Sequence, residues 1–253
     1  MLRELRARKP LIHCITNHVV SNFQANGLLA LGVSPVMGDE RQEVAELTGH
    51  ADALSLNIGT VTERSFESML IAGRTAMEKS IPIVLDPVGA GATAYRLQAV
   101  KRLLAELDIT LLRCNAGELA AIAGADWQAR GVDAGEGQGD LEALAKQVAN
   151  EYQTLVAVTG TEDLVTDGER TGHITGGDPL MASVTGMGCL LSAVLAAFLT
   201  DEDSNRLDAV ACGLQLYADA GSRASKIALN PGTFQTAFLD ELSKAQEAIL
   251  YGS

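Results

Sequence analysis

The sequence is poor in basic residues and lacks a long apolar run. Its 253 residues include 19 Lys and Arg against 32 Asp and Glu, which gives a formal net charge of −13. Nucleic acids and anionic membranes are bound through clustered Lys and Arg, so this balance argues against both as partners. The longest apolar stretch, 189–199, falls far short of the roughly 20 residues that cross a bilayer. We therefore expect neither nucleic-acid binding nor a membrane role.

Several familiar motifs are also missing. Cys14, Cys114, Cys189 and Cys212 are widely separated and show no CxxC spacing, so neither a zinc site nor a disulfide framework is indicated. The histidines form no HxH or HExxH arrangement, which argues against a histidine-ligated metal. The first residues, MLRELRARKP, are charged and lack the apolar segment of a signal peptide. A cytoplasmic location is the simplest expectation.

Short apolar, β-branched runs alternate with helical patterns along the chain. That alternation predicts an α/β fold whose central, mainly parallel sheet is covered by helices on both faces, in a single domain over residues 1–253. The predicted strands lie within 11–16, 53–59, 81–91, 109–115 and 154–160. The predicted helices are 19–31, 63–79, 94–106, 117–122, 141–151, 187–199, 207–226 and 233–250.

Three local features complete the expected fold. The segment DLVTDGERTGHIT has a turn at Asp167 and Gly168 between two extended runs, which predicts a β-hairpin at the edge of the sheet. Residues 131–140, GVDAGEGQGD, are expected to form a flexible Gly-rich loop. We expect Cys14 and Cys212 to be small core residues, and His13 to be a hydrogen-bonded histidine within a strand.

Polar residues follow the predicted strands at the points where each strand ends. They are Thr16, Asn17, Gly59, Thr60, Asp86, Asn115, Glu118, Thr159 and Gly160. In open α/β sheets, ligands bind beyond the carboxyl ends of the strands. These residues are therefore the first candidates for a binding site.

The segment TGMGC, 185–189, stands before an apolar helix and is neither a Walker A loop nor a GxGxxG motif. Gly186 and Gly188 allow the backbone to curl so that N–H groups, including those of Met187 and Cys189, point into one hollow at the positive helix end. Such a hollow suits a phosphate or the charge that develops during phosphate transfer. A tight strand-to-helix turn is the alternative. Cys189 lies in the first helical turn, where we expect the dipole to lower the pKa of the thiol.

Two carboxylates stand near neighbouring strand ends. Asp86 follows the run IPIVL, and Glu118 falls in the first turn of the helix after the next strand. Together they could hold Mg²⁺, directly or through water, beside a substrate phosphate. The alternatives are a strand-end cap for Asp86 and a capping-box partner for Glu118. Arg113 could face polyphosphate charge or form an ordinary surface salt bridge.

Taken in order, these motifs resemble the hydroxyethylthiazole kinase family of the ribokinase-like superfamily, from about residue 10 to 240. The matching pieces are ITN at 15–17, SPVM at 34–37, NIGT at 57–60, LDPVGAGAT at 85–93, RCNAGE at 113–118, VTG at 158–160, GGDPLM at 176–181 and GMGC at 186–189. Each piece alone is weak, but eight in order are specific.

The resemblance implies a three-layer ribokinase-like fold and transfer of the ATP γ-phosphate to the hydroxyl of 4-methyl-5-(2-hydroxyethyl)thiazole, in thiamine biosynthesis or salvage. It also implies dependence on Mg²⁺ and a homotrimer with the thiazole site between subunits. Asp86 and Glu118 would organise Mg²⁺, and Cys189 would accept the proton of the substrate hydroxyl. The residues that would hold ATP are Arg113, Thr159 and Asn115. Those that would contact the thiazole are Asn17, Met37, Gly59, Thr60 and Gly186.

Two departures from the family pattern bear on the site. The family most often has GTGC, whereas this chain has Met187 between the glycines, and residues 38–43, GDERQE, are more charged than the family leads us to expect. Three alternative hypotheses for the function remain. They are a hydroxymethylpyrimidine or pyridoxal kinase, an ATP-dependent dehydratase of hydrated nicotinamide cofactors, and a thiazole- or thiamine-binding regulator without activity. The first usually carries aspartate at the position of Cys189. The second fits ITN and SPVM less well, and the third has no use for a metal beside a phosphate hollow.

Overall fold

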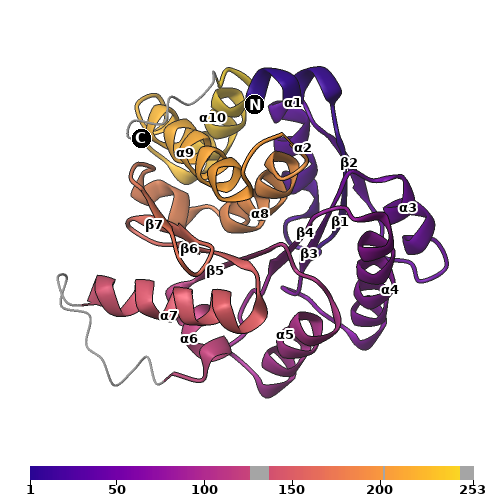
Figure 1. The fold of residues 1–253 in the computed structure, drawn as a ribbon. Coiled ribbons are helices and arrows are strands. Elements are labelled where there is room, and N and C mark those ends of the chain that lie inside the picture. Colours follow the sequence, from indigo (N-terminus) through magenta and orange to yellow (C-terminus); the bar gives the residue numbers. More distant parts are fainter. Residues whose placement is uncertain (126–136, 202, 246–253) are drawn as a thin grey trace.

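Eight strands form one sheet in the computed structural model, which describes residues 1–125, 137–201 and 203–245 (Figure 1). The strand order is β2-β1-β3-β4-β5-β6-β7-β8. Strands β1 to β6 pair in parallel, whereas β7 and β8 join by antiparallel pairing. The strands are β1 (Leu11–Ile15), β2 (Ser34–Met37), β3 (Ala53–Asn57), β4 (Ile83–Asp86), β5 (Leu111–Asn115), β6 (Leu155–Thr159), β7 (Asp163–Thr166) and β8 (Thr171–Ile174). The predicted α/β class with a mainly parallel sheet is confirmed.

Helices cover both faces of this sheet, so the molecule has three layers (Figure 1). One apolar cluster joins one face of the sheet to α1 (Leu2–Arg8), α2 (Ser21–Leu31), α8 (Met187–Phe198), α9 (Arg206–Ala224) and α10 (Pro231–Ser243). The second cluster joins the other face to α3 (Val44–His50), α4 (Glu63–Lys79), α5 (Ala94–Glu106), α6 (Ala116–Ala123) and α7 (Gly137–Tyr152). A short 3-10 helix, η2 (Pro179–Ser183), precedes α8. Among the described residues, no helix combines the length and apolar character that a membrane span requires.

Helices α4, α5, α6 and α9 each begin after a residue whose side chain caps them. Thr62 caps α4 in a capping box with Ser65, and Asn205 accepts hydrogen bonds from two backbone N–H groups at the start of α9. The prediction matches α4 and α5 in full and α2, α6, α8 and α9 within two residues at each end. It missed α1, α3 and β2, which are short elements of seven, seven and four residues.

The predicted hairpin and the predicted Gly-rich loop had different outcomes. The predicted hairpin is present as β7 and β8, with β8 at the sheet edge. Of the predicted Gly-rich loop 131–140, residues 137–140 belong to α7, so that part of the prediction was wrong. Residues 131–136 lie outside the described part of the chain, as do residues 246–250 of the predicted last helix.

Three residues expected in the core are there. Cys14 and Cys212 are buried in the cluster that contains α8 and α9, and burial raises the pKa of the Cys14 thiol to about 12. His13 in β1 is fully buried and its two ring nitrogens lie 2.8 Å from the Thr48 hydroxyl and 2.9 Å from the Gly38 carbonyl oxygen. Burial lowers the pKa of His13 and favours the neutral ring, against a smaller opposing effect of the hydrogen bond to Gly38.

Candidate active site

The parallel register brings the predicted polar residues to one edge of the sheet. Asn57 at the end of β3 stands opposite Asp86 at the end of β4, and Asn115 at the end of β5 stands opposite Thr159 at the end of β6. The first turn of α8 lies over the same edge, because Ser192 of that helix contacts Asp86. The expected site therefore forms at the carboxyl ends of the strands.

Asp86 is the buried anion of this site. Its Oδ2 accepts hydrogen bonds from the Asn57 side-chain amide at 2.8 Å and from the Ser192 hydroxyl at 2.9 Å. Its Oδ1 has no hydrogen-bond partner within the described residues. Burial raises the pKa of Asp86 to about 6, and the nearby Glu118 adds to the shift, while Arg113 and the two hydrogen bonds oppose it. Asp86 is therefore not merely a cap for a strand end.

Arg113 of β5 supplies the buried cation. Its Nη1 lies 3.7 Å from Asp86 Oδ1, and its Nη2 donates a hydrogen bond to Thr159 Oγ1 at 2.5 Å. Only 11% of its side chain is exposed, so the alternative of an ordinary surface salt bridge does not describe it. Its Nε has no hydrogen-bond partner in the described part of the chain. A guanidinium held in this way can bind phosphate oxygens in a fixed direction.

The glycines of GMGC allow a close approach between backbone and side chains. Gly186, which precedes α8, has φ 93°, and a Cβ there would lie 2.9 Å from Val20 Cγ1. A Cβ on Gly188 would lie 2.6 Å from Arg113 Nη1, so the guanidinium rests against this backbone. Met187 is buried in the core, which leaves only its backbone for the hollow. The change from Thr to Met in this motif therefore leaves the backbone hollow in place.

Two buried side chains donate hydrogen bonds to the backbone of the first turn of α8. Gln24 of α2 donates to the carbonyl oxygen of Cys189 at 2.9 Å, and the Tyr217 hydroxyl of α9 donates to the carbonyl oxygen of Met187 at 2.7 Å. No side chain among the described residues caps α8. The first N–H groups of a helix have no partner within the helix, so this turn presents donors in a fixed position to an anion.

Glu118 is the capping-box residue of α6, and its carboxylate also contacts the loop after β4. Asn115 caps α6 by accepting from the Glu118 backbone at 2.9 Å, and Glu118 Oε2 accepts from the Asn115 backbone at 2.9 Å. Its Oε1 accepts from the backbone N–H of Gly89 at 2.9 Å, in the loop after Asp86. The capping-box alternative is thus present, and the carboxylate also holds the neighbouring loop.

The donor set suits Mg²⁺ in part. Among residues 1–125, 137–201 and 203–245, no three His, Cys, Asp or Glu side chains are grouped as a metal site. Asp86 Oδ1 is nevertheless a buried carboxylate oxygen without a hydrogen bond, and Glu118 lies near enough to raise the pKa of Asp86. Mg²⁺ usually takes one or two carboxylates and completes its octahedron with water and substrate phosphates. Asp86 and Glu118 fit that pattern.

The prediction of a lowered pKa for Cys189 was wrong. The thiol is half-buried, and its Sγ accepts a hydrogen bond from the Asn17 side-chain amide at 3.5 Å. Burial raises the pKa of Cys189 to about 11, and the charge of Asp86 adds to the rise, against smaller effects of Asn57, Asn17 and Arg113. Position at a helix start does not overcome desolvation beside a carboxylate. At neutral pH this group is mainly a thiol.

The residues predicted to contact the thiazole lie beside Cys189 and toward β2. A Cβ on Gly59 would lie 2.7 Å from Asn17 Nδ2, and the Thr60 hydroxyl accepts from the backbone N–H of His18 at 3.3 Å. Met37 ends β2 at the same edge of the sheet, level with Cys14, and is half-buried. Asn17, Gly59 and Thr60 therefore form one group, with Met37 two strands away from Asn57.

Sequence reasoning assigned no role to Asn57, Ser192, Gln24 or Tyr217. Asn57 ends an apolar strand and opens the quoted motif NIGT, which was a usable signal. Ser192 and Tyr217 stand within helices whose inward faces are buried, and nothing in their spacing distinguishes them from packing residues. Their role becomes visible only when α8 is placed against β4.

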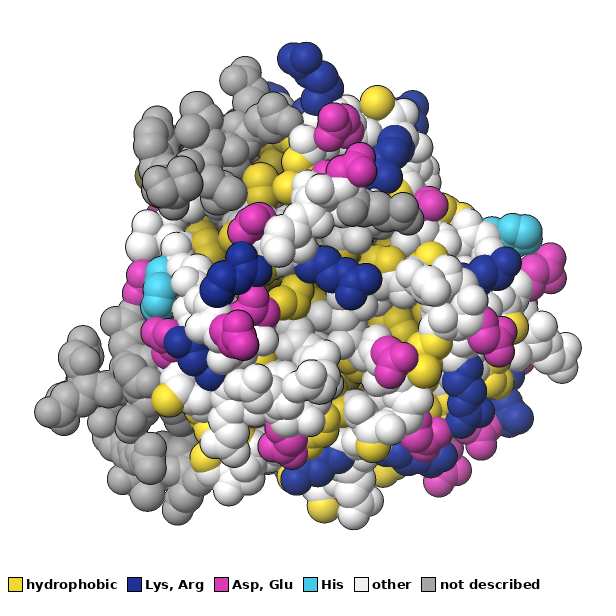
Figure 2. Space-filling view, viewed as in Figure 1, with side chains coloured by type: hydrophobic (Ala, Val, Ile, Leu, Met, Phe, Trp, Pro, Cys, Tyr) yellow, Lys and Arg dark blue, Asp and Glu magenta, His cyan; other side chains and the backbone are white. Residues whose placement is uncertain are grey.

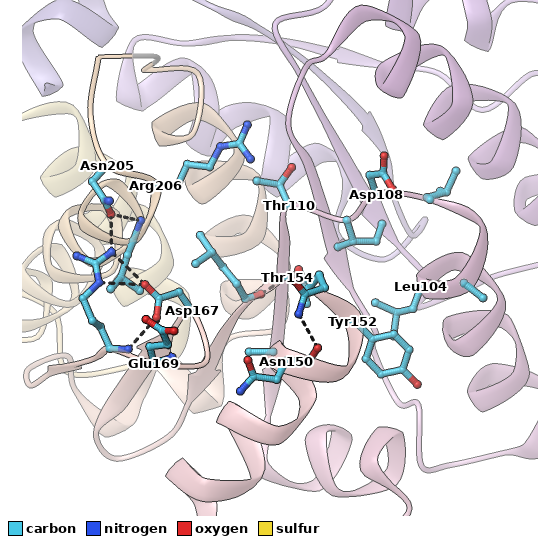
Figure 3. A pocket seen from close by; sticks show the side chains of 18 residues that line it. Leu104, Asp108, Thr110, Asn150, Tyr152, Thr154, Asp167, Glu169, Asn205 and Arg206 are labelled. Atoms are coloured by element: carbon cyan, nitrogen blue, oxygen red, sulfur yellow. Dashed lines mark hydrogen bonds and ion pairs between the residues drawn. The ribbon is translucent and has the colours of Figure 1, made fainter.

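A separate hollow opens at the opposite edge of the sheet. It measures about 740 Å³ and is lined by residues that precede β5 and β6, including Thr110 and Thr154 (Figure 3). Asp167 and Asn205 lie on one side of it and Leu104 on the other, and no residue predicted for the active site lines it.

On the face drawn in Figure 2, acidic and basic side chains are interspersed rather than gathered into one basic patch.

The fold is that of ribokinase-like proteins. A ribokinase-like superfamily protein from Enterococcus faecalis aligns with 94% of this chain and 88% of its own, with a TM-score of 0.68 and 12% identity, which shows the shared fold. The hydroxyethylthiazole kinase family model matches residues 2–248.

The chain belongs to the hydroxyethylthiazole kinase family. It is 51% identical to a hydroxyethylthiazole kinase from Haemophilus influenzae strain PittEE over 243 residues, which are 96% of this chain and 92% of that protein. The solved structure of a hydroxyethylthiazole kinase from Pyrococcus horikoshii is 40% identical and has a TM-score of 0.88, over 97% of this chain and 92% of that one. The family resemblance read from the motifs is confirmed.

Proposed function

We propose that this protein, as a single catalytic domain, transfers the γ-phosphate of ATP to the hydroxyl of 4-methyl-5-(2-hydroxyethyl)thiazole, in thiamine biosynthesis or salvage. Besides membership in the family, one arrangement supports this most. The Arg113 guanidinium lies between Asp86, Thr159 and the backbone of Gly188, at the open start of α8. A cation, a carboxylate and free N–H groups converge there, as phosphoryl transfer requires.

In the proposed reaction, the thiazole hydroxyl oxygen forms a bond to the γ-phosphorus while the bond to the β-phosphate oxygen breaks and ADP leaves. Arg113 and the N–H groups of residues 186–189 stabilise charge on the transferred group. Thr159 holds one end of the guanidinium, and Asn115, at the end of the neighbouring strand, lines the ATP side. Asp86 and Glu118 would hold Mg²⁺, which, when bound, neutralises phosphate charge.

Asn17 and Cys189 stand on the thiazole side of the site, together with Gly59 and Thr60. The Asn17 amide donates to Cys189 Sγ, so the pair can hold the attacking hydroxyl close to the hollow. The hydroxyl proton passes to Cys189 when that residue is a thiolate. Because its pKa is about 11, the reactive fraction is small at neutral pH, and positioning contributes more than deprotonation.

The proposal includes a homotrimer whose thiazole site lies between subunits. In support, β2 is an edge strand with only half-buried residues, and Met37 ends it. Val19 in the turn before α2 exposes 67% of its surface, and Leu29 within α2 exposes 60%. Light scattering should give three times the mass of the chain, 26.5 kDa. A monomer that binds thiazole as tightly as the assembled protein would refute the shared site.

A cytoplasmic location, where ATP is supplied, stays a prediction.

The decisive experiment measures ADP release from ATP and Mg²⁺ with hydroxyethylthiazole, hydroxymethylpyrimidine and pyridoxal offered separately. Release that depends on the thiazole supports the proposal. Release only with another alcohol would keep the fold and refute the substrate. No release from folded protein with any of the three would favour a binding protein without activity.

A further inference from the structure

The two oxygens of the Asp86 carboxylate have different surroundings. Oδ2 accepts two hydrogen bonds, from Asn57 at 2.8 Å and from Ser192 at 2.9 Å. Oδ1 accepts none from the described residues, and its nearest cation is Arg113 Nη1 at 3.7 Å. All the hydrogen bonds thus hold one oxygen and leave the other for a ligand or ion.

The direction of the Asn57 amide is fixed by its own partners. Its Oδ1 accepts from Asn17 Nδ2 at 2.8 Å and from the backbone N–H of Gly59 at 3.0 Å. A flipped amide would place its NH₂ group against these two donors and its oxygen against Asp86. The amide must therefore donate to the carboxylate, and Asn17, in contact with Cys189, belongs to the same connected group.

Ser192 joins the carboxylate to the helix that forms the phosphate hollow. It is fully buried in an apolar helix, one turn after Gly188, whose carbonyl oxygen lies 3.4 Å from the hydroxyl. A buried hydroxyl destabilises a protein unless it is hydrogen-bonded. Asp86 is its shorter contact. The hydroxyl therefore fixes the distance between the end of β4 and the start of α8.

We propose that Asn57 and Ser192 are positioning residues that hold Asp86 with Oδ2 saturated and Oδ1 directed toward Arg113 and the Mg²⁺ of the bound nucleotide. This inference rests on the proposed function, because it assigns a task within the ATP side of that site. Without the Ser192 hydroxyl, Oδ2 keeps only one donor. The carboxylate can then turn, and its free oxygen no longer has a single direction.

The test compares Ser192→Ala with a matched control, Ser55→Ala. Ser55 is also buried and lies on β3, but its hydroxyl has no hydrogen-bond partner among the described residues. Calorimetry measures ADP binding over a range of Mg²⁺ concentrations and in EDTA. We expect Ser192→Ala to need about 10-fold more Mg²⁺ for half-maximal binding, since a hydrogen bond to a charged group is lost. Affinity for ADP in EDTA and KM for the thiazole should stay native, and Ser55→Ala should stay native throughout.

Two further variants keep the proposal falsifiable if Ser192→Ala does not fold. Ser192→Thr retains the hydroxyl and should recover most of the native Mg²⁺ dependence. Asn57→Asp replaces the donor by a second carboxylate beside Asp86 and should weaken Mg²⁺-dependent binding more than Ser192→Ala does. Thermal unfolding is recorded for every variant, so that a loss of stability is separated from a loss of Mg²⁺ affinity.

The outcomes separate this inference from the function on which it rests. Equal Mg²⁺ dependence in Ser192→Ala and Ser55→Ala would overturn the positioning role with the kinase intact. An equal loss of ADP affinity with and without Mg²⁺ would also overturn it, because the residue would then act on the fold alone. A native protein that binds Mg²⁺ and ADP but phosphorylates no thiazole would overturn the proposed substrate and leave the comparison of variants valid.

Discussion

Arg113 Nη2 donates to Thr159 Oγ1 at 2.5 Å and thereby joins the ends of β5 and β6. The same guanidinium directs Nη1 to Asp86 and rests against Gly188. One planar cation therefore contacts two strand ends and the start of α8. A lysine, with a single ammonium group, cannot make these contacts together.

Arg113→Lys should therefore lower kcat about 100-fold or more while the protein stays folded, in line with the loss of a fixed donor to a developing charge. Thr159→Ser, which keeps the hydroxyl, is the matched control and should stay close to native. The measurement is ADP release with saturating thiazole. Native kcat in Arg113→Lys would mean that charge alone, without direction, is sufficient.

Gly186 is expected to tolerate substitution far less than Cys189. Gly186→Val places a branched side chain at φ 93° with its Cβ 2.9 Å from Val20 Cγ1, so the backbone turn that forms the phosphate hollow must shift. Cys189→Ala removes only the thiol, and the backbone N–H group of residue 189 remains in the hollow. We expect the loss of kcat/KM to be much larger for Gly186→Val, with circular dichroism used to check that both variants are folded. Equal losses in two folded variants would show that the hollow lies elsewhere.

Much of this arrangement could be predicted from local patterns. Apolar strands and the turn residues that follow them are local features of the sequence. In a parallel sheet, strand ends such as Asp86 and Thr159 must then share an edge. Glu118 three residues after Asn115 is a capping box that sequence alone suggests. These features depend on spacing along one segment, and spacing is visible in a sequence.

What the sequence could not show depends on contacts between distant segments. Ser192 is 106 residues from Asp86, and within its helix it resembles any small core residue. The pKa of Cys189 was predicted in the wrong direction because the helix start is a local feature, whereas burial and the approach of Asp86 are tertiary. Edge strand β2 was missed because four half-buried residues give little apolar pattern.

The high pKa of Cys189 predicts how the reaction depends on pH. If its thiolate accepts the substrate proton, the single-turnover rate should rise about tenfold per pH unit between pH 6 and 9, because the thiolate fraction grows until the pKa of about 11 is reached. Cys189→Asp should retain activity and show a much flatter profile, since a carboxylate is ionised over most of that range.

A rapid-mixing measurement of phosphorylated thiazole checks both profiles. Cys189→Ala serves as the reference without any acceptor at this position. A flat profile in the native protein, or an inactive but folded Cys189→Asp, would assign the proton to another acceptor and leave Cys189 a binding role beside Asn17.

Asp86 should make the protein less stable as the pH rises. Its pKa is raised by burial from 3.8 to about 6, so the folded state holds this proton more tightly than the unfolded state does. The group's favourable contribution is complete below about pH 4 and is lost as the pH rises through 6. With about 1.4 kcal/mol per pKa unit, the loss amounts to about 3 kcal/mol.

Asp86→Asn removes this titration and should abolish kinase activity. Measured against the native protein by urea unfolding in EDTA, the variant should gain about 3 kcal/mol in relative stability between pH 4 and pH 8. Asp163 is a useful comparison, because burial also raises its pKa, but its Oδ1 accepts from the Gly160 backbone N–H and it lies outside the Asn57 and Ser192 group. A stability difference between native and Asp86→Asn protein that does not change with pH would show that the buried carboxylate has an ordinary pKa, held down by Arg113, Asn57 and Ser192 together.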